Sequence, residues 1–383
     1  MRPRGDPHAV LPTRALGGAT ARGRGAAAAA PAGARSAGAG TDRRLLAAAH
    51  GDAPARTERT PARRRRRVGC AGGTHALRPA PVKLRLGTRG SLLARAQSGL
   101  VAAALEQAGH EVTLVPIVTD GDVRLPDTAW GEGAFVGALE AALRQGDVDL
   151  AVHSAKDVPI EPEDELLIAA YPRRADPRDA LVTRAEAASL PRLPHGATVG
   201  TDSPRRAAFL RAARPDLQVR SLHGNVDTRL RRLDAGEVGA LVLAVAGLSR
   251  LGRDQRISAV LDAELMTPAP GQGALAVQVR AADAAVRGAV AALDDAPTRL
   301  CVELERGVLE AAGGGCRAPL GALATLHGEE LRVLAVAATE DGRRRMTSRW
   351  AGPVEDSPGI PARLAAELLA AGYRETVLAV SGS

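Results

Sequence analysis

The amino-acid sequence predicts an α/β protein of two similar lobes, followed by a smaller α+β domain and preceded by a disordered tail. The chain has 383 residues, enough for two or three domains that each bury a core. From residue 82 onward, short apolar runs of strand length alternate with stretches of helical periodicity. One pattern, a strand followed by Gly-Thr, Ser and a helix, occurs at residues 86–91 and again at 199–203. This repetition favours two lobes of corresponding build.

The segment before the folded part has a composition of its own. Residues 1–81 contain sixteen Arg, no Lys and four acidic residues, and consist mostly of Ala, Arg, Gly and Pro. Such a segment buries too little apolar surface to offset its ordering entropy, so we expect it to be disordered. Its net charge of +12 leaves −4 for residues 82–383, so the total of +8 says little about the partners of the folded part. We interpret the tail as dispensable, with Val82 as a candidate start of the working protein.

The first lobe is expected to begin with a strand at residues 82–86 and a helix capped by Ser91. Four residues at helical spacing form the expected inner face of this helix: Leu93, Ala96, Leu100 and Ala104. A second strand is predicted at residues 111–118 and a third at 147–152. The third strand places residues 153–157 just past its carboxyl end, which is where open α/β sheets bind ligands.

The second lobe is expected to repeat this unit. A strand at residues 197–200 leads through a polar turn to a helix with Pro204 at its first position. Both lobes then present a helix N-terminus suited to a phosphate or a carboxylate. Further strands are predicted at residues 217–222 and 238–245. A Pro-rich segment at 267–273 precedes a strand at 274–279, which we expect to return to the first lobe.

The smaller α+β domain is predicted from residue 296 onward. A helix comes first, and a glycine loop follows it. The remaining expected elements are strands near residues 331–338 and 347–351, a helix at 361–371 and a last strand.

The chain has three cysteines, and one of them is unusual. Cys70, Cys301 and Cys316 are too few for a disulfide framework and do not have the spacing of a zinc site, so we expect a reducing, cytoplasmic environment. Cys70 lies in the tail, and Cys301 lies on the apolar face of a helical pattern, where we expect it to be packed. Cys316 follows three consecutive glycines. A mobile glycine loop suits a thiol that must reach into a cleft and carry a group.

Three segments together resemble the porphobilinogen deaminase (hydroxymethylbilane synthase) family. They are His-Ser-Ala-Lys-Asp at residues 153–157, Gly-Thr-Asp-Ser-Pro-Arg-Arg at 200–206 and Gly-Gly-Gly-Cys-Arg-Ala-Pro at 313–319. The resemblance runs from about residue 82 to the C-terminus and implies two lobes like those of type-2 periplasmic binding proteins. The implied domains are a tail at 1–81, lobe 1 at 82–172 and 273–291, lobe 2 at 177–267, and a C-terminal domain at 296–383 that carries the cofactor cysteine.

The resemblance implies a transferase that deaminates four porphobilinogen molecules and joins them head to tail. The growing oligopyrrole is built on a dipyrromethane cofactor bound covalently through Cys316, and hydroxymethylbilane and ammonia are released. Asp157 is the implied catalytic residue, since a carboxylate can stabilise the cation formed when porphobilinogen loses ammonia and can transfer protons. A thiolate at Cys316 is a suitable nucleophile for the attachment.

The same resemblance implies how the anionic pyrroles are bound. Each ring carries an acetate and a propionate, so the site needs several fixed cations, preferably Arg. The implied binders of cofactor and substrate carboxylates are Arg89, Ser91, Ser154, Lys156, Thr201, Ser203, Arg205, Arg206, Arg229 and Arg250. Phe135 is implied to lie on a lid and Gln272 to position substrate, whereas His153 is expected to be structural.

Two residues depart from the family pattern. Glu132 replaces a lid Lys that many members carry, and His223 replaces the usual Arg before Gly-Asn. Neutral His offers one donor and no permanent charge, so we expect weaker substrate binding or slower elongation.

Two other interpretations stay open at this point. A non-catalytic two-lobed anion-binding protein would share the helix corners but would not need Cys316 or Asp157, and a degenerate deaminase could be disabled at Glu132 and His223. Nucleic-acid binding is favoured only by the basic tail, because the whole chain has two Phe, two Tyr and two Trp for base stacking. We therefore expect a cytoplasmic monomer with no metal, no nucleic-acid partner and no membrane partner.

Overall fold

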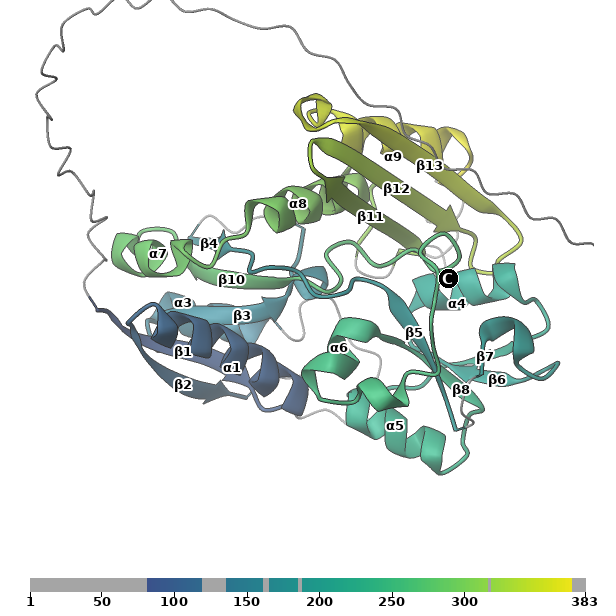
Figure 1. The fold of residues 1–383 in the computed structure, drawn as a ribbon, viewed down its shortest axis with the longest axis horizontal. Helices are drawn as coiled ribbons and strands as arrows, with labels where there is room; N and C mark the ends of the chain where they lie inside the picture. Colours follow the sequence, from purple (N-terminus) through teal and green to yellow (C-terminus); the bar gives the residue numbers. More distant parts are fainter. Residues whose placement is uncertain (1–80, 119–135, 161–164, 185–187, 316–317, 374–383) are drawn as a thin grey trace, which may run out of the picture. The chain divides into compact units, whose positions relative to one another are not determined.

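The computed structural model describes residues 81–118, 136–160, 165–184, 188–315 and 318–373. These residues belong to one compact unit, Gly73–Ser383 (Figure 1). The predicted tail lies outside the described residues, except for Pro81.

The first sheet has five strands in the order β2-β1-β3-β10-β4. β1 pairs in parallel with β2 and β3, whereas β10 is antiparallel to β3 and β4. Its strands are β1 (Lys83–Arg89), β2 (Glu111–Ile117), β3 (Leu150–Ser154), β4 (Leu166–Ala170) and β10 (Leu275–Arg280). The helices of this lobe are α1 (Leu92–Gln107), α3 (Gly137–Gln145) and α7 (Ala284–Ala291). The return of the strand after the Pro-rich segment to the first lobe is thereby confirmed.

Helix α1 buries a different face from the one that its apolar spacing suggested. Leu100, expected inside, is 55% exposed, and the buried residues include Gln97 and Ser98. Ser98 Oγ donates a hydrogen bond to Thr88 Oγ1 at 2.8 Å, and Gln97 Nε2 donates to Ser154 Oγ at 2.9 Å. The helix therefore turns polar groups toward the strand ends, because each of them finds a partner there.

The second sheet has the order β7-β6-β8-β5-β9, in which each strand corresponds to one of the first sheet. β6 is parallel to β7 and β8, and β5 is antiparallel to β8 and β9. Its strands are β5 (Asp179–Thr183), β6 (Thr198–Gly200), β7 (Gln218–Arg220), β8 (Ala240–Ala244) and β9 (Ala259–Val260). The helices are α4 (Pro204–Ala213), α5 (Val226–Asp234) and α6 (Val245–Arg250). The prediction of two α/β lobes of corresponding build is confirmed.

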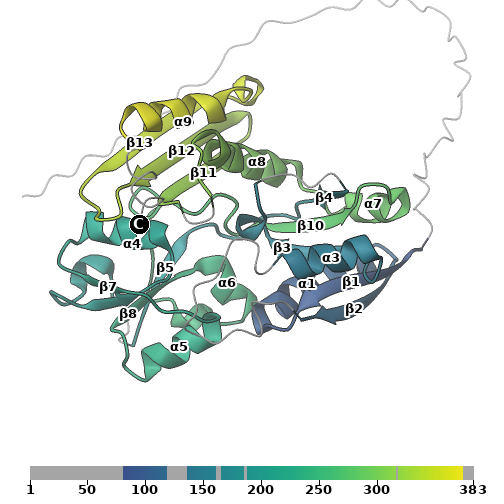
Figure 2. The same ribbon diagram turned by 180° about the vertical axis from the view of Figure 1, so that it is seen from behind.

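Two segments cross between the lobes, and they touch. One joins β4 to β5 and the other leads from β9 to β10. Gly273 has φ +88°, and a Cβ at this position would lie 2.6 Å from Ala175 O, so only glycine allows the two backbones to approach this closely. The Ala175 N–H donates a hydrogen bond to Gly273 O at 3.2 Å. The lobes also meet where α1 contacts α6 (Figure 2).

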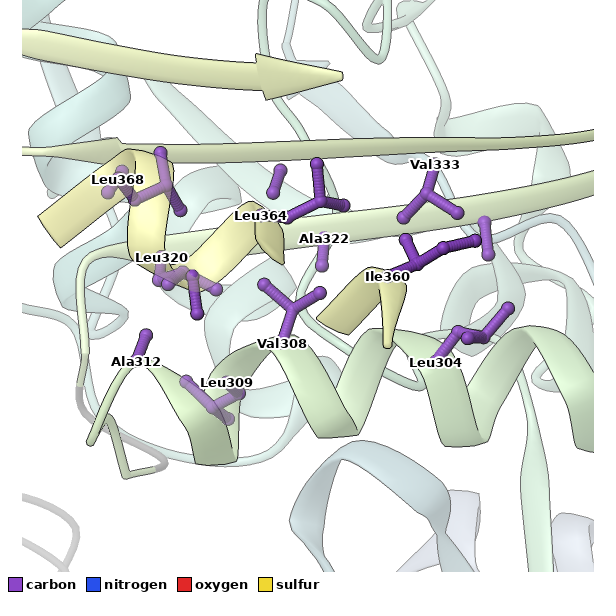
Figure 3. Close-up of a cluster of buried hydrophobic side chains, with 14 of the residues drawn as sticks. Leu304, Val308, Leu309, Ala312, Leu320, Ala322, Val333, Ile360, Leu364 and Leu368 are labelled. Carbon is purple, nitrogen blue, oxygen red and sulfur yellow. The ribbon is translucent and has the colours of Figure 1, made fainter. Parts of the chain in front are cut away.

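The C-terminal domain is an antiparallel sheet covered on one face by two helices. The sheet has the order β11-β12-β13, with β11 (Leu320–His327), β12 (Glu330–Ala338) and β13 (Arg345–Pro353). Leu304 and Val308 of α8 (Ala296–Ala311) pack against Leu364 of α9 (Ile360–Ala370) and Val333 of β12 (Figure 3). The smaller α+β domain is thus confirmed, with β11 as a strand that the sequence analysis did not predict. The predicted last strand lies outside the described residues.

Candidate functional site

The turn after β3 places two charged residues at the edge of the first sheet. β3 pairs with β10 as far as Ser154, two residues beyond the predicted strand end. Ala155, Lys156 and Asp157 follow on a short helical turn, and the latter two are its charged residues. Asp157 is exposed, whereas Lys156 is half-buried. The candidate catalytic carboxylate is therefore open to a ligand.

His153, which the sequence analysis expects to be structural, lies in the interior of the first sheet. Its side chain is buried, and its Nε2 lies 3.0 Å from Gln278 Oε1. Burial, together with the nearby Arg89 cation, lowers the pKa of His153 to about 4. The imidazole is neutral at pH 7 and adds no charge to the site.

The helix corner of the first lobe brings three more predicted residues together. Arg89 ends β1 and is half-buried, and Ser91 caps α1 by accepting a hydrogen bond from Ala94 N at 3.2 Å. Ser154 lies beside this helix because it accepts the hydrogen bond from Gln97. The end of β1, the start of α1 and the end of β3 therefore form one polar edge.

The corresponding corner of the second lobe is built on Ser203 and two buried arginines. Ser203 Oγ caps α4 by accepting from Arg206 N, and Thr201 Oγ1 accepts from Ser203 N at 3.2 Å. The Arg205 and Arg206 guanidinium groups each lie 2.7 Å from a carboxylate oxygen of Asp179, which is fully buried. The single charge of Asp179 offsets only one of these two positive charges, and Arg205 Nε is buried without a hydrogen-bond partner in the described part of the chain.

Gln272 connects the two lobes at this point. Its Oε1 accepts hydrogen bonds from Lys156 Nζ at 3.3 Å and from Arg206 Nη2 at 3.4 Å. Its Nε2 donates to Asp179 Oδ1 at 2.9 Å and to Pro177 O at 2.7 Å. One buried amide on a crossing segment thus positions a cation of lobe 1 against the ion pairs of lobe 2.

Three further cations of the site are not fully balanced by neighbouring anions. Burial lowers the pKa of Lys156 to about 8 and the pKa values of Arg229 and Arg250 to about 10. The Arg229 side chain has no hydrogen-bond or ion-pair partner among the described residues, and Arg250 donates one hydrogen bond, to Gly273 O at 2.7 Å. His223, also half-buried, has its Nδ1 2.6 Å from Asp202 Oδ2.

A cavity lies beside the glycine loop, between the two lobes and the C-terminal domain. It contains about 450 Å³ of empty space, part of it open to solvent. Its polar lining comes from Lys156, Ser203, Arg205 and Arg306, and apolar residues such as Leu309 and Leu320 complete the wall. Gly315, the residue before Cys316, also lines it. Cys316 itself lies outside the described residues, as do Phe135 and Glu132.

The residues present fit a polyanionic ligand with an apolar body. A nearby anion stabilises a buried cation whose pKa is lowered. A guanidinium nitrogen without a partner can donate a hydrogen bond to that anion. Lys156 and Arg205 supply such groups in the lining of the cavity, where Leu309 and Leu320 supply apolar surface. Arg229 and Arg250 have lowered pKa values but do not line this cavity. A dipyrromethane, with two pyrrole rings and four carboxylates, has the matching chemistry.

Two buried carboxylates that bind groups around this site were not predicted from the sequence. Asp179 precedes an apolar run, and Glu305 occupies a position on the apolar face of α8. A carboxylate in such a place is a signal for a buried residue that is paired with a cation. Glu305 accepts hydrogen bonds from Arg174 at 2.6 and 2.9 Å and from Gly271 N at 2.7 Å. Arg306, also missed, donates to three carbonyls of residues 155–159 and lines the cavity.

The described part of the chain holds neither a metal-binding cluster nor a membrane-crossing helix. No group of three or more His, Cys, Asp or Glu side chains there could hold a metal ion. None of its helices combines the length and the apolar character needed to cross a membrane.

Two binding proteins are among the solved structures with a partly similar backbone. The methionine-binding protein MetQ is 15% identical, with a TM-score of 0.38 over 55% of this chain and 89% of that protein. The periplasmic sulfonate-binding protein SsuA from Methylobacillus flagellatus is 14% identical, with a TM-score of 0.34 over 58% of this chain and 72% of that protein.

Sequence comparisons are much closer. The family model "Porphobilinogen deaminase, dipyromethane cofactor binding domain" matches residues 84–288, and "Porphobilinogen deaminase, C-terminal domain" matches residues 299–370. A porphobilinogen deaminase of Acidothermus cellulolyticus is 50% identical over 76% of this chain and 89% of the relative. One of Roseiflexus castenholzii is 48% identical over 76% of this chain and 96% of the relative. The chain therefore belongs to the porphobilinogen deaminase family.

Proposed function

We propose that the protein is the transferase that joins four porphobilinogen molecules on a dipyrromethane primer held by Cys316, releasing hydroxymethylbilane and ammonia. The observation that carries this proposal is the cation-lined cavity beside Gly315, in a chain whose family is defined by a dipyrromethane-binding domain. The dipyrromethane, when bound, supplies the ring to which the first porphobilinogen is joined.

The residues of this chain would divide the work between binding and proton transfer. Lys156, Arg205 and Arg229 supply charge for the carboxylates of primer and substrate, and Gln272 keeps Lys156 in place. The loss of ammonia leaves a cation on porphobilinogen. Exposed Asp157, at the sheet edge next to Lys156, stabilises that charge and takes up the proton released when the rings couple.

Cys301 is unsuited to hold the primer. It is buried among the residues of the C-terminal core, and burial raises the pKa of its thiol to about 11, so little thiolate forms at pH 7. Cys316, next to a residue that lines the cavity, is the better candidate.

Intact-protein mass spectrometry tests the proposed function and the attachment site together. The purified parent and a Cys301→Ala variant are expected to carry an added mass of two linked pyrrole units, and a Cys316→Ala variant is expected to carry none. A parent mass that stays bare after incubation with porphobilinogen or with preformed hydroxymethylbilane would overturn the proposal. An adduct that moves to Cys301 would overturn the assignment of the cysteine alone.

The charge of Lys156 predicts a pH dependence. Since its pKa is lowered to about 8, the ammonium is present below that pH and is lost as the pH rises above it. We expect kcat/KM for porphobilinogen to fall about tenfold between about pH 7.5 and 9.5, because the substrate then loses one charged hydrogen bond. Lys156→Arg stays charged and should flatten this fall.

The chain offers a matched control, since Lys83 and Lys156 are its two lysines and the Lys83 side chain is 85% exposed. Lys83→Arg is expected to keep the parental profile. A Lys156→Arg profile identical to the parent's would show that another group titrates.

We also propose that the protein acts as a monomer in the cytoplasm. An unpaired Cys301 is in keeping with a reducing compartment. Light scattering during size-exclusion chromatography measures the oligomeric state, and a mass above that of one chain would contradict the monomer.

A further inference from the structure

A helix of the C-terminal domain binds the turn of lobe 1 that carries Asp157. Arg306 of α8 extends its guanidinium to three backbone carbonyls there. Its Nη1 donates hydrogen bonds to Ala155 O at 3.0 Å and to Val158 O at 2.9 Å, and its Nη2 donates to Pro159 O at 2.6 Å. These carbonyls lie on both sides of Asp157 in the sequence. One planar group therefore holds the backbone before and after the candidate catalytic carboxylate.

The α8 helix is itself fixed against its neighbours, so Arg306 projects from a rigid support. Val302, one turn earlier, is fully buried and packs in one apolar cluster with Ala155 and Val158. At the next residue of the helix, a Cβ on Gly307 would lie 3.1 Å from a side chain of α9, so the two helices approach closely there. Replacing Arg306 should therefore remove the hydrogen bonds to the turn and leave its apolar contact with the helix in place.

The same helix leads into the glycine loop before Cys316. Gly315, a few residues beyond the end of α8, lines the cavity together with Arg306. The helix thus carries both the approach to the proposed primer cysteine and the side chain that binds the turn of Asp157. A carboxylate exchanges a proton or stabilises a developing cation effectively only when it lies close to the reacting group. A displaced turn would therefore slow the chemical step more than it would weaken binding.

We infer that Arg306 is a positioning residue, which fixes the place of Asp157 relative to the primer held by Cys316. Arg306 acts through Asp157, and three of the five N–H groups of its guanidinium are engaged by the turn. Direct binding of a primer carboxylate by Arg306 is the alternative that the test has to separate. The inference rests on the proposed function, because Asp157 has its catalytic role only in that reaction.

Steady-state kinetics on the full-length holoenzyme tests the inference through a double-mutant cycle. Arg306→Met should lower kcat for porphobilinogen about 10²-fold and change KM less than about threefold, since a misplacement of about 1 Å can have such an effect. In a chain that already carries Asp157→Asn, the same substitution should lower kcat by less than a further threefold or so, because the group that Arg306 positions is already lost.

Arg299→Met is the matched control. Arg299 lies two turns earlier on α8, pairs with Asp294 at 2.8 Å and also donates a hydrogen bond to lobe 1, to Ala169 O of β4 at 3.0 Å. It therefore binds the lobe but not the turn of Asp157. Arg299→Met should keep kcat within about threefold of the parent, even if its thermal midpoint falls as far as that of Arg306→Met.

Four outcomes would overturn the inference. Losses of kcat that multiply in the double variant would show that Arg306 acts independently of Asp157. A larger rise in KM, or a purified Arg306→Met protein without the mass of the primer, would show that Arg306 binds substrate or primer directly. A kcat within tenfold of the parent would show that the contact has no bearing on the reaction. An equal loss of kcat in Arg299→Met would assign the effect to general docking of the helix.

Amide hydrogen exchange of the purified full-length protein is independent of activity. The peptide that contains residues 155–160 should exchange faster in Arg306→Met than in the parent or in Arg299→Met, because the turn opens more often. Unchanged exchange would refute the contact itself. Faster exchange in a protein whose parent does not convert porphobilinogen would refute the proposed function and leave the contact standing. Arg306→Lys, which can still donate to these carbonyls, allows the same measurements with a smaller expected effect if Arg306→Met does not fold.

Discussion

Replacing Asp157 with Asn is expected to lower kcat for porphobilinogen about 10³-fold and to change KM less than about fivefold. Asparagine keeps the size of the side chain but loses the charge that stabilises the cation left by ammonia, and it cannot accept the proton from the coupled ring. Because Asp157 is exposed, on a turn after β3, the fold should not suffer. A kcat loss without a KM loss is the signature of a group that acts in the transition state.

Asp147→Asn is the matched control. Asp147 is also exposed and lies before β3, at the opposite end of the same strand from Asp157. It should retain parental kcat. A kcat within tenfold of the parent in Asp157→Asn, with the cofactor mass present, would remove Asp157 from the catalytic role.

The second large effect is expected on stability. Asp179→Asn should lower the free energy of unfolding by about 3–5 kcal/mol, because it leaves Arg205 and Arg206 buried without their counter-ion. The two arginines hold the pKa of Asp179 well below its usual range, so its contribution is complete above the ordinary pKa of an aspartate and is lost as the pH falls. Urea unfolding at pH 7 measures the difference. At lower pH, as Asp179 itself becomes protonated, the gap between parent and variant should narrow.

Asp176 provides the comparison for this measurement. It lies three residues earlier, on the crossing segment that leads into β5, and also pairs with an arginine, but the Arg178 and Asp176 side chains are 47% and 29% exposed. Asp176→Asn should therefore cost less than about 1 kcal/mol. Equal losses in the two variants would mean that burial of the Asp179 pair is not what makes it strong.

Local rules predicted the parts of this protein that depend on neighbours in sequence. Ser91 caps α1 and Pro204 opens α4, as the sequence indicated, because each feature depends on residues within one helical turn. The inner face of α1 was predicted wrongly, since Gln97 reaches a partner 57 residues away. Apolar spacing carries no information about such a bond.

The sequence indicated candidate site residues but not the contacts that connect them. The roles of Arg205 and Arg206 as substrate binders remain predictions, and their pairing with Asp179 could not be read from the sequence because 26 and 27 residues separate the partners. Gln272 is separated from Asp179 by 93 residues. The crossing segments bring these residues, which are far apart in the sequence, beside one another in space.

The strand order has a consequence for synthesis on the ribosome. The second sheet draws all its strands from residues 179–260, so it can close as soon as that stretch has emerged. The first sheet cannot, because β10 lies between β3 and β4 and is made more than a hundred residues after them. Folding from the N-terminus onward is the usual order during translation, and here it is reversed. Until residue 280 is made, the first lobe has a gap between β3 and β4. A chaperone or a strand of another chain can bind to the unpaired strand edges there.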